Sequence, residues 1–322
     1  MGRTSRNRAA NRSGTGRKKK RLQLWPQAKR YTLVHEQPPG DHIVSTAAIK
    51  CLKEQYPSLL LGVRANHNEV FYNNPYLTHN NDPEGEEIQL QYSDGVTNSD
   101  KRPIHFMQAY CDDLGEKLNL TIKLTTNKPD LHLSDFEKTT RDVKKPYWLV
   151  NASHKNDYSI KKWRPEHWQT VVDMLRDRGI LCVQVGNEAP FILKNAINFV
   201  GQTNLRQLFR LVYHSKGAIT CESMLNHACA ALERPAIVLC SGLFPLQWIA
   251  YPRSKLLGYG GLLPCTNAGG ACWASNIALC KRPKGDFPEC MELIEPAEVV
   301  RNVLAVERGR EPLPLIAPRI TN

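Results

Sequence analysis

Apolar positions along the chain form two kinds of pattern, short continuous runs and stripes at helical spacing. The run "YTLVHE" at 31–36 predicts a buried strand, and beyond a Pro-Pro-Gly turn the apolar positions from Ile43 to Tyr56 recur at helical spacing. The same rhythm continues in "LLLGVRAN", "GEEIQLQYS", "HFMQAYCDDLGEKLN" and "LTIKLTT", which predict a strand, a strand, a helix and a strand. The first part of the chain therefore alternates strands with helices.

The second part repeats this alternation after "RDVKKP", which we expect to be a linker. Strands are predicted at "YWLVNAS", "ILCVQVG", "GAITC" and "PAIVLCSG", with helical patterns between them. The almost continuously apolar "ILCVQVG" is typical of a parallel strand buried on both faces. Together the two parts predict an α/β protein with two doubly wound domains, which bind ligands at the carboxyl ends of their strands.

The length of 322 residues also favours two domains over one core. We expect a basic tail over 1–30, an N-terminal domain over 31–143, a C-terminal domain over 144–310 and a C-terminal tail over 311–322. No apolar run approaches the ~18 residues of a membrane helix. No apolar stretch follows the basic start of the chain, as it would in a secretory signal. We therefore expect a cytoplasmic protein.

The net charge of +12 belongs to the predicted N-terminal tail. Residues 1–30 hold eleven of the 43 Lys and Arg residues and no acidic residue, which leaves 32 basic and 31 acidic residues for the rest. A segment so poor in apolar side chains does not bury enough surface to fold alone. We expect a disordered extension, and contact with nucleic acid or an anionic membrane surface is the alternative.

A carboxylate, Asp41, follows the Pro-Pro-Gly turn between the first strand and its helix. Asp is a favoured N-cap residue, so a capping role is one interpretation. The carboxyl end of the strand also directs Asp41 towards the predicted ligand cleft. Both roles are compatible with the sequence.

Two further stretches suit phosphate groups. "SIKKWRPEHW" carries Lys161 just before a helix, where backbone N–H groups and a lysine favour an anion, although a solvated basic loop has the same composition. "ITCESMLNHACAALERP" is a second strand–turn–helix junction, in which Glu222 could bind a ribose hydroxyl beside Ser223, and His227 alone is more typical of packing. Neither stretch is a GxGxxG or Walker loop, so a nicotinamide cofactor and ATP hydrolysis are not supported.

In order and spacing, these motifs resemble glycosyltransferase family 9, the ADP-heptose-dependent heptosyltransferases. The resemblance covers about residues 31–310 and rests on "PPGDHIVSTAAIKCLKEQYP", "SIKKWRPEHW", "ESMLNHACAALERPAIVL" and the helix "TNLRQLFRLVYHS". The family pattern has Gly-Asp after the first strand, Lys-x-Trp before a helix, and an acidic-Ser/Thr-Gly-x-x-His run. Here Met224 stands where the family usually has Gly, and Glu222 where it usually has Asp. These two departures concern donor-contacting positions.

The resemblance implies a GT-B fold, in which an N-terminal acceptor domain faces a C-terminal nucleotide-sugar domain across a cleft. It implies that Asp41 is the general base and that transfer inverts the anomeric centre. It also implies a metal-free donor site for a nucleoside-diphosphate sugar such as ADP-heptose, built from Ser153, Lys161, Glu222, Ser223 and His227. The acceptor would be a glycan or protein hydroxyl, and the protein could form an oligomer.

Ten cysteines fall into two groups. Six are scattered through predicted helices and strands, where free Cys usually packs as a small apolar residue. The other four lie in an irregular loop at 265–290 and could reach one tetrahedral metal ion: Cys265, Cys272, Cys280 and Cys290. The loop resembles the iron-binding Cys cluster of the autotransporter heptosyltransferases in its Cys-Trp and Glu-Cys elements. We expect structural iron or zinc there, with free thiols or two disulfides as the alternatives.

Two other functions compete with sugar transfer. The altered turn at Glu222 and Met224 is compatible with a GT-B protein that binds sugars or partners without catalysis. A nucleic-acid-binding protein would use the basic tail and the four-cysteine site. The net charge of +1 outside the tail argues against this second alternative, because nucleic-acid-binding faces carry a clear basic surplus.

Overall fold

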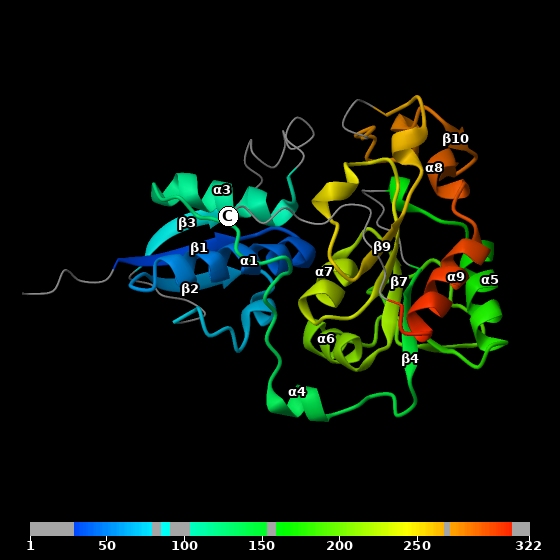
Figure 1. Ribbon diagram of the computed structural model, residues 1–322, viewed down its shortest axis with the longest axis horizontal. Helices are drawn as coiled ribbons and strands as arrows, with labels where there is room; N and C mark the ends of the chain where they lie inside the picture. Colours follow the sequence, from blue (N-terminus) through cyan, green and yellow to red (C-terminus); the bar gives the residue numbers. More distant parts are fainter. Residues whose placement is uncertain (1–28, 79–84, 91–103, 153–158, 267–270, 311–322) are drawn as a thin grey trace, which may run out of the picture.

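The computed structural model describes residues 29–78, 85–90, 104–152, 159–266 and 271–310. Ser153 and nearly all of the two predicted tails lie outside these residues. Figure 1 shows two lobes, one around each of two parallel sheets. This arrangement confirms the predicted α/β fold with two doubly wound, Rossmann-like domains facing each other. No helix of the described residues is long and apolar enough to cross a bilayer.

The first lobe is built on a three-stranded parallel sheet of order β2-β1-β3. Its strands are β1 (Arg30–His35), β2 (Leu60–Ala65) and β3 (Glu86–Leu90). Helix α1 (Pro39–Gln55) and helix α3 (Phe106–Leu118) pack against each other beside this sheet, with η1 (Asn68–Phe71) after β2. Residues 41–49 of α1 are all buried, because this helix is covered by neighbours on several sides.

The second lobe holds a six-stranded, wholly parallel sheet of order β6-β5-β4-β7-β8-β9. The strands are β4 (Tyr147–Asn151), β5 (Leu181–Gln184), β6 (Ala196–Asn198), β7 (Gly217–Cys221), β8 (Ala236–Leu239) and β9 (Ser254–Leu257). Its larger helices are α5 (Pro165–Arg176), α6 (Leu205–His214), α7 (Met224–Ala231) and α9 (Pro296–Glu307). Strands β7 and β8 are buried along their whole length. Strand β5, whose apolar run predicted a strand buried on both faces, is buried from Cys182 to Gln184.

The remaining described elements are short. They are the helices α4 (Asp135–Thr139) and α8 (Glu289–Glu292), the hairpin strands β10 (Pro283–Lys284) and β11 (Phe287–Pro288), and the 3₁₀ turns η2 (Ser159–Lys161), η3 (Leu246–Trp248), η4 (Gly260–Leu262) and η5 (Ile277–Leu279). Helix α4 lies on the connection between the two lobes and has a complete capping box between Ser134 and Glu137.

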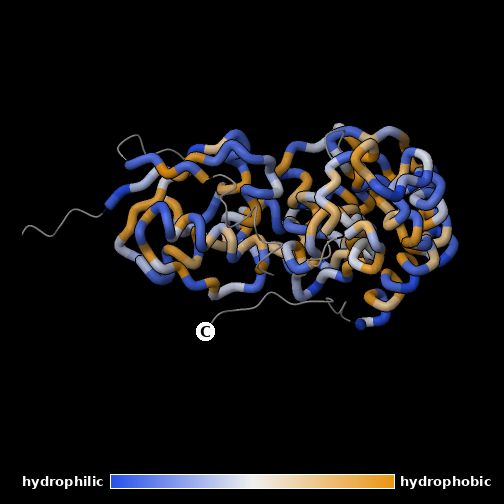
Figure 2. Tube along the Cα trace, turned by 90° about the horizontal axis from the view of Figure 1, so that it is seen from above, coloured by the Kyte–Doolittle hydropathy of each residue, from blue (hydrophilic) through white to orange (hydrophobic). Residues whose placement is uncertain are grey.

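The two lobes meet through helices α1 and α7, which contact each other. One apolar core runs from the first sheet through these helices to one face of the second sheet. A separate core on the opposite face packs α5 and α9 against the second sheet. Figure 2 shows the two lobes side by side, with apolar stretches running through the interior of each.

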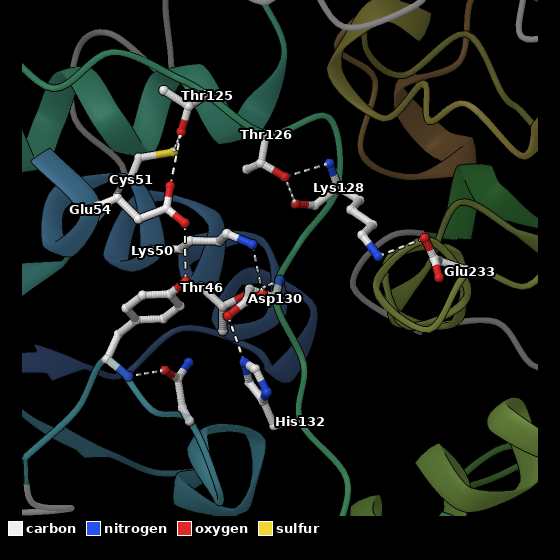
Figure 3. Close-up of polar contacts among 12 residues, drawn as sticks. Thr46, Lys50, Cys51, Glu54, Thr125, Thr126, Lys128, Asp130, His132 and Glu233 are labelled. Atoms are coloured by element: carbon white, nitrogen blue, oxygen red, sulfur yellow. Dashed lines mark hydrogen bonds and ion pairs between the residues drawn. The ribbon is translucent and has the colours of Figure 1, made fainter.

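The prediction of a strand at "LTIKLTT" is wrong. These residues form an extended segment without sheet pairing. Side chains of α1 form hydrogen bonds with its backbone groups instead. The Gln55 amide donates to the carbonyl of Lys123 at 2.8 Å, and its oxygen accepts from the Lys123 N–H at 3.0 Å. Nearby, Oγ1 of Thr125 lies 3.3 Å from Sγ of Cys51 (Figure 3), and the N–H of Thr125 donates to the same sulfur at 3.3 Å. Apolar residues alternate here because one side of the segment lies on α1.

The same segment continues to the second lobe through charged contacts (Figure 3). Asp130 accepts from Lys50 on α1 at 3.4 Å and pairs with His132 at 2.6 Å. Lys128 forms an ion pair of 2.8 Å with Glu233, which follows α7. The segment thus connects α1 with the α7 end of the second lobe.

Candidate functional site

The turn between β1 and α1 brings Asp41 to the boundary between the lobes. Asp41 lies in the first turn of α1, where the positive end of the helix dipole favours a carboxylate. The N-cap residue is Pro38, and no side chain caps the helix, so the capping interpretation of Asp41 is wrong. A capping residue would precede the helix, whereas Asp41 lies inside it. Its side chain is largely buried, with 8% of the residue exposed.

Gly40 holds this turn against α7 of the other lobe. A Cβ atom on Gly40 would lie 3.4 Å from Cα of Met224 and 3.5 Å from Cδ2 of His227. The motif residues of β1–α1 and those of β7–α7 are therefore neighbours, although about 180 positions separate them in the sequence. This contact joins the predicted general base to the predicted donor residues.

Ser223 and Glu222 form the turn between β7 and α7. The Ser223 hydroxyl is the N-cap of α7, because it accepts from the N–H of Leu225 at 3.2 Å. Glu222 is buried, and its Oε2 accepts from the Ser241 hydroxyl at 3.1 Å. Burial raises the pKa of Glu222 to about 7, against the opposing effect of Lys161 and of the hydrogen bonds from Ser241. Its carboxyl group therefore titrates close to neutral pH.

Lys161 ends the 3₁₀ turn η2 and reaches the same place. Its Nζ lies 3.9 Å from Oε2 of Glu222 and 4.4 Å from the centre of the Phe244 ring. The charge of Lys161 also helps to lower the pKa of His227, although burial is the larger cause. Lys161, Glu222 and His227 thus share one electrostatic environment.

His227 forms a buried polar cluster with two residues that motif analysis missed. Its Nδ1 lies 2.7 Å from the hydroxyl of Tyr251. The rings of His105 and Tyr251 make an edge contact, with 4.8 Å between their centres. Burial, with a smaller effect of the neighbouring His227, lowers the pKa of His105 to about 3. Both imidazoles are therefore neutral at physiological pH.

The structure brings together five of the six predicted donor and base positions around this cluster. Gly40, which precedes Asp41, packs beside His227. The charge of Lys161 helps to lower the pKa of His227 after burial, the larger cause. Lys161 also pairs with Glu222, which precedes Ser223. Ser153 lies outside the described residues. No motif in the sequence pointed to His105, Ser241 or Tyr251, because these residues come from three other segments. Their only signal is that a polar residue lies in an otherwise apolar stretch.

The four cysteines of the 265–290 loop line one cavity of about 30 Å³. Cys265, Cys272 and Cys280 are partly exposed, and Cys290 is buried. The N–H of Gly242 donates to Sγ of Cys290 at 3.4 Å. Burial raises the pKa of Cys290 to about 12, and the charges of Cys272 and Cys280 add to the shift. Burial, with smaller effects of Cys265 and Cys280, also raises the pKa of Cys272, so each of the four thiols lies near another one.

All ten cysteines are free thiols in this structure, so the alternative of two disulfides is not supported. Among the described residues, no group of three or more His, Cys, Asp or Glu side chains is arranged to hold a metal ion. The four predicted ligands share a cavity, but the described residues do not confirm a metal site there. A thiolate set of this kind is chemically suited to zinc or iron.

The cysteine loop also contacts the segments around Lys161 and Ser241. The N–H of Cys272 donates to the carbonyl of Gly242 at 2.6 Å, and the N–H of Ile160 donates to that of Ser275 at 3.5 Å. Ile160 packs with Leu243 and Ala274 in a small apolar cluster. The loop therefore supports the backbone on both sides of the Lys161–Glu222 pair.

A sequence comparison with family models decides the family. The model described as "Glycosyltransferase family 9 (heptosyltransferase)" matches residues 97–255, which include Lys161, Glu222, Ser223 and His227. These residues therefore form a glycosyltransferase family 9 domain. It is thus a glycosyltransferase of the heptosyltransferase type, as its motifs predicted. No curated protein matches the chain.

Solved structures of other glycosyltransferases share the fold of this chain. The ADP-heptose LPS heptosyltransferase II of E. coli is 15% identical with a TM-score of 0.61, over 87% of this chain and 99% of that one. The iron-containing dodecameric glycosyltransferase TibC of enterotoxigenic E. coli is 16% identical with a TM-score of 0.65, over 87% and 77%. A family 9 glycosyltransferase of Veillonella parvula is 11% identical with a TM-score of 0.62, over 89% and 99%.

Proposed function

We propose that this family 9 glycosyltransferase moves a heptose or similar sugar from a nucleoside-diphosphate donor to an acceptor hydroxyl, with inversion of the anomeric centre. The observation that carries the proposal is the contact of the Gly40–Asp41 turn with His227 on α7. This contact supports a reaction in which a base from one lobe acts beside a donor held by the other. One displacement by the acceptor oxygen, from the face opposite the leaving diphosphate, inverts the centre.

Asp41 is the general base in this proposal. It accepts the proton of the acceptor hydroxyl as the oxygen attacks the anomeric carbon. Its burial beside α7 supports this role, because a carboxylate removed from bulk water is held in position for the transfer. A positioned base of this kind contributes typically ~10²–10⁴-fold to the rate.

Lys161, Ser153, Ser223 and His227 hold the diphosphate in this proposal, and Glu222 contacts the ribose. The ammonium group of Lys161 stabilises the negative charge that develops on the leaving diphosphate. Among the described residues, Oε1 of Glu222 is buried without a hydrogen-bond partner. A buried carboxyl oxygen without a partner favours a ligand hydroxyl at that position.

ADP-heptose is the donor that we propose first. E. coli heptosyltransferase II is named for this donor, and TibC has been solved in complex with ADP-D-β-D-heptose. The acceptor is a glycan or protein hydroxyl. TibC is described as dodecameric, which supports the proposal that this chain also forms an oligomer.

We further propose that Cys265, Cys272, Cys280 and Cys290 hold one structural iron or zinc ion. Two observations support the site: the shared cavity and the description of TibC as iron-containing. The bound metal would supply folding free energy to a loop with little apolar content. It takes no part in the displacement.

The experiment that tests the transfer measures nucleoside diphosphate release from the full-length protein. ADP-heptose is offered with candidate acceptors, and UDP-glucose and GDP-mannose serve as comparison donors. Acceptor-dependent release from ADP-heptose that is lost in the Asp41→Asn variant supports the proposal. Binding of ADP-heptose without release under any condition supports the binding-only alternative instead. No binding of any nucleotide sugar contradicts both.

A further inference from the structure

Tyr251 makes a close buried contact with His227. Its hydroxyl lies 2.7 Å from Nδ1 of His227, and the side chain is fully buried. Tyr251 lies between η3 and β9, outside every motif of the family pattern. A buried hydroxyl needs a hydrogen-bond partner, because leaving it unpaired costs ~1–3 kcal/mol.

The direction of this hydrogen bond follows from the surroundings of Tyr251. Within the described part of the chain, Nδ1 of His227 is the hydrogen-bond partner of its hydroxyl. Burial, together with the charge of Asp41, raises the pKa of Tyr251 well above its ordinary value, so the hydroxyl keeps its proton. The O–H therefore donates to Nδ1, since the proton would otherwise be buried without an acceptor.

This direction determines where His227 carries its own proton. Burial, and then the charge of Lys161, lowers the pKa of His227 to about 3, so the imidazole is neutral. A neutral imidazole has one N–H group and one accepting nitrogen. Because Nδ1 accepts from Tyr251, the proton is on Nε2. In the ring Nε2 is bonded to Cδ2, the atom that faces the Gly40–Asp41 turn.

We propose that Tyr251 is a positioning residue that holds His227 in its Nε2–H form, so that His227 donates a neutral hydrogen bond to an oxygen of the nucleotide sugar. The inference rests on the proposed function, in which His227 contacts the donor. The opposite tautomer would present a lone pair to the diphosphate or sugar oxygen, which repels it. Tyr251 thus selects one of the two tautomers of His227, in which Nε2 is the hydrogen-bond donor.

The first test measures the tautomer in the ligand-free, full-length protein by ¹⁵N NMR with labelled histidine. The His227 signals are assigned by their loss in the His227→Gln variant. We expect a protonated Nε2 and an unprotonated Nδ1 in the wild-type protein. A proton on Nδ1, or an even mixture of the two forms, overturns the inference. This result does not depend on transfer, so it separates a failure here from a failure of the proposed function.

The second test removes the hydroxyl with Tyr251→Phe and keeps the ring. We expect a mixture of tautomers at His227 and roughly tenfold weaker binding of ADP-heptose, the size of one ordinary hydrogen bond. Tyr259→Phe is the matched control, because the hydroxyl of Tyr259 donates to Glu298 at 2.9 Å away from this cluster. Unchanged binding in Tyr251→Phe overturns the inference.

The third test combines the two positions. In the His227→Gln variant an amide N–H replaces Nε2–H, and an amide has no tautomers. Tyr251→Phe should then weaken ADP-heptose binding less than twofold in this background. A full tenfold effect there would mean that Tyr251 acts on the fold or on the ligand directly, and it overturns the positioning role.

Discussion

Lys161 and Glu222 form a pair, 3.9 Å apart, in which the carboxyl group is buried and the ammonium group is partly exposed. The two residues come from η2 and from the turn after β7. Ile160 next to Lys161, and Gly242 next to the Ser241 that binds Glu222, both form backbone hydrogen bonds with the cysteine loop. A bound diphosphate would compete with Glu222 for the Lys161 ammonium group. The pair therefore links donor binding to the ionisation of one buried acid.

Replacing Lys161 by Ala should weaken binding of ADP more than binding of adenosine. The reason is that an ammonium group acts on the diphosphate and leaves the nucleoside unaffected. Isothermal calorimetry with both ligands gives the two affinities. Lys162→Ala is the matched control, with an expected loss of less than twofold for either ligand. An equal loss for ADP and adenosine in Lys161→Ala would exclude a phosphate contact.

The stability of the protein should depend on Glu222 between pH 4.5 and about 7. The folded-state pKa of about 7 lies above the ordinary value of 4.5, so the folded form retains a proton that the unfolded form has lost. The contribution of Glu222 is therefore complete below pH 4.5 and is lost as the pH rises towards 7, by about 1.4 kcal/mol per pH unit at most.

Glu222→Gln removes this titration, and urea unfolding at pH 5 and pH 8 measures the difference. We expect the variant to gain stability relative to the wild-type protein on going from pH 5 to pH 8. A constant difference between the two proteins at both pH values would show that Glu222 titrates normally.

Asp41→Asn should abolish transfer and leave the affinity for the nucleotide sugar almost unchanged. The amide keeps the size of the side chain and removes the basic oxygen that accepts the proton. The measurements are single-turnover transfer and calorimetric binding of the donor. Asp135→Asn, an exposed first-turn acid of α4, is the control for a general effect of the change. Normal turnover in Asp41→Asn would disprove the base assignment.

Any single Cys→Ser change among Cys265, Cys272, Cys280 and Cys290 should lower metal content and thermal stability together. The thiolates are the proposed ligands, and structural metal sites contribute folding free energy directly. Elemental analysis and thermal unfolding are measured on the same preparations. Cys182→Ala, a buried cysteine of β5, is the control: it should lose stability and keep its metal. Metal-free wild-type protein of full stability would rule out the site.

Arg206→Ala should destabilise the protein by about 3–5 kcal/mol, the usual result of leaving a buried partner charge unpaired. Arg206 on α6 binds the Glu137 carboxylate of α4, with Nε 2.7 Å from Oε1. It also donates to the carbonyls of His132 and Glu69, so it joins both lobes to the connection between them. Urea unfolding measures the loss. Arg176→Ala, which breaks only exposed ion pairs, should leave the stability almost unchanged.

Much of the fold could be predicted because helices and strands differ in the spacing of their apolar residues along the chain. The apolar runs of β7 and β8 and the helical stripe of α6 each identify an element within a few residues. In the segment at 120–126, the spacing of apolar residues predicted the wrong element. Its alternation comes from lying on α1, and the side chain of Gln55 supplies the hydrogen bonds that a neighbouring strand would otherwise supply.

By itself, the sequence determined the order of the elements, the two-part α/β organisation and the motif residues Asp41, Lys161 and His227. These features depend on residues near one another in the chain, where spacing expresses which side faces the core. Only the tertiary structure decided that Tyr251 meets His227 and that Lys161 pairs with Glu222. It also decided that the four cysteines of the loop share one cavity. Such contacts join distant segments, and their geometry depends on how the lobes and sheets pack, which no local pattern contains.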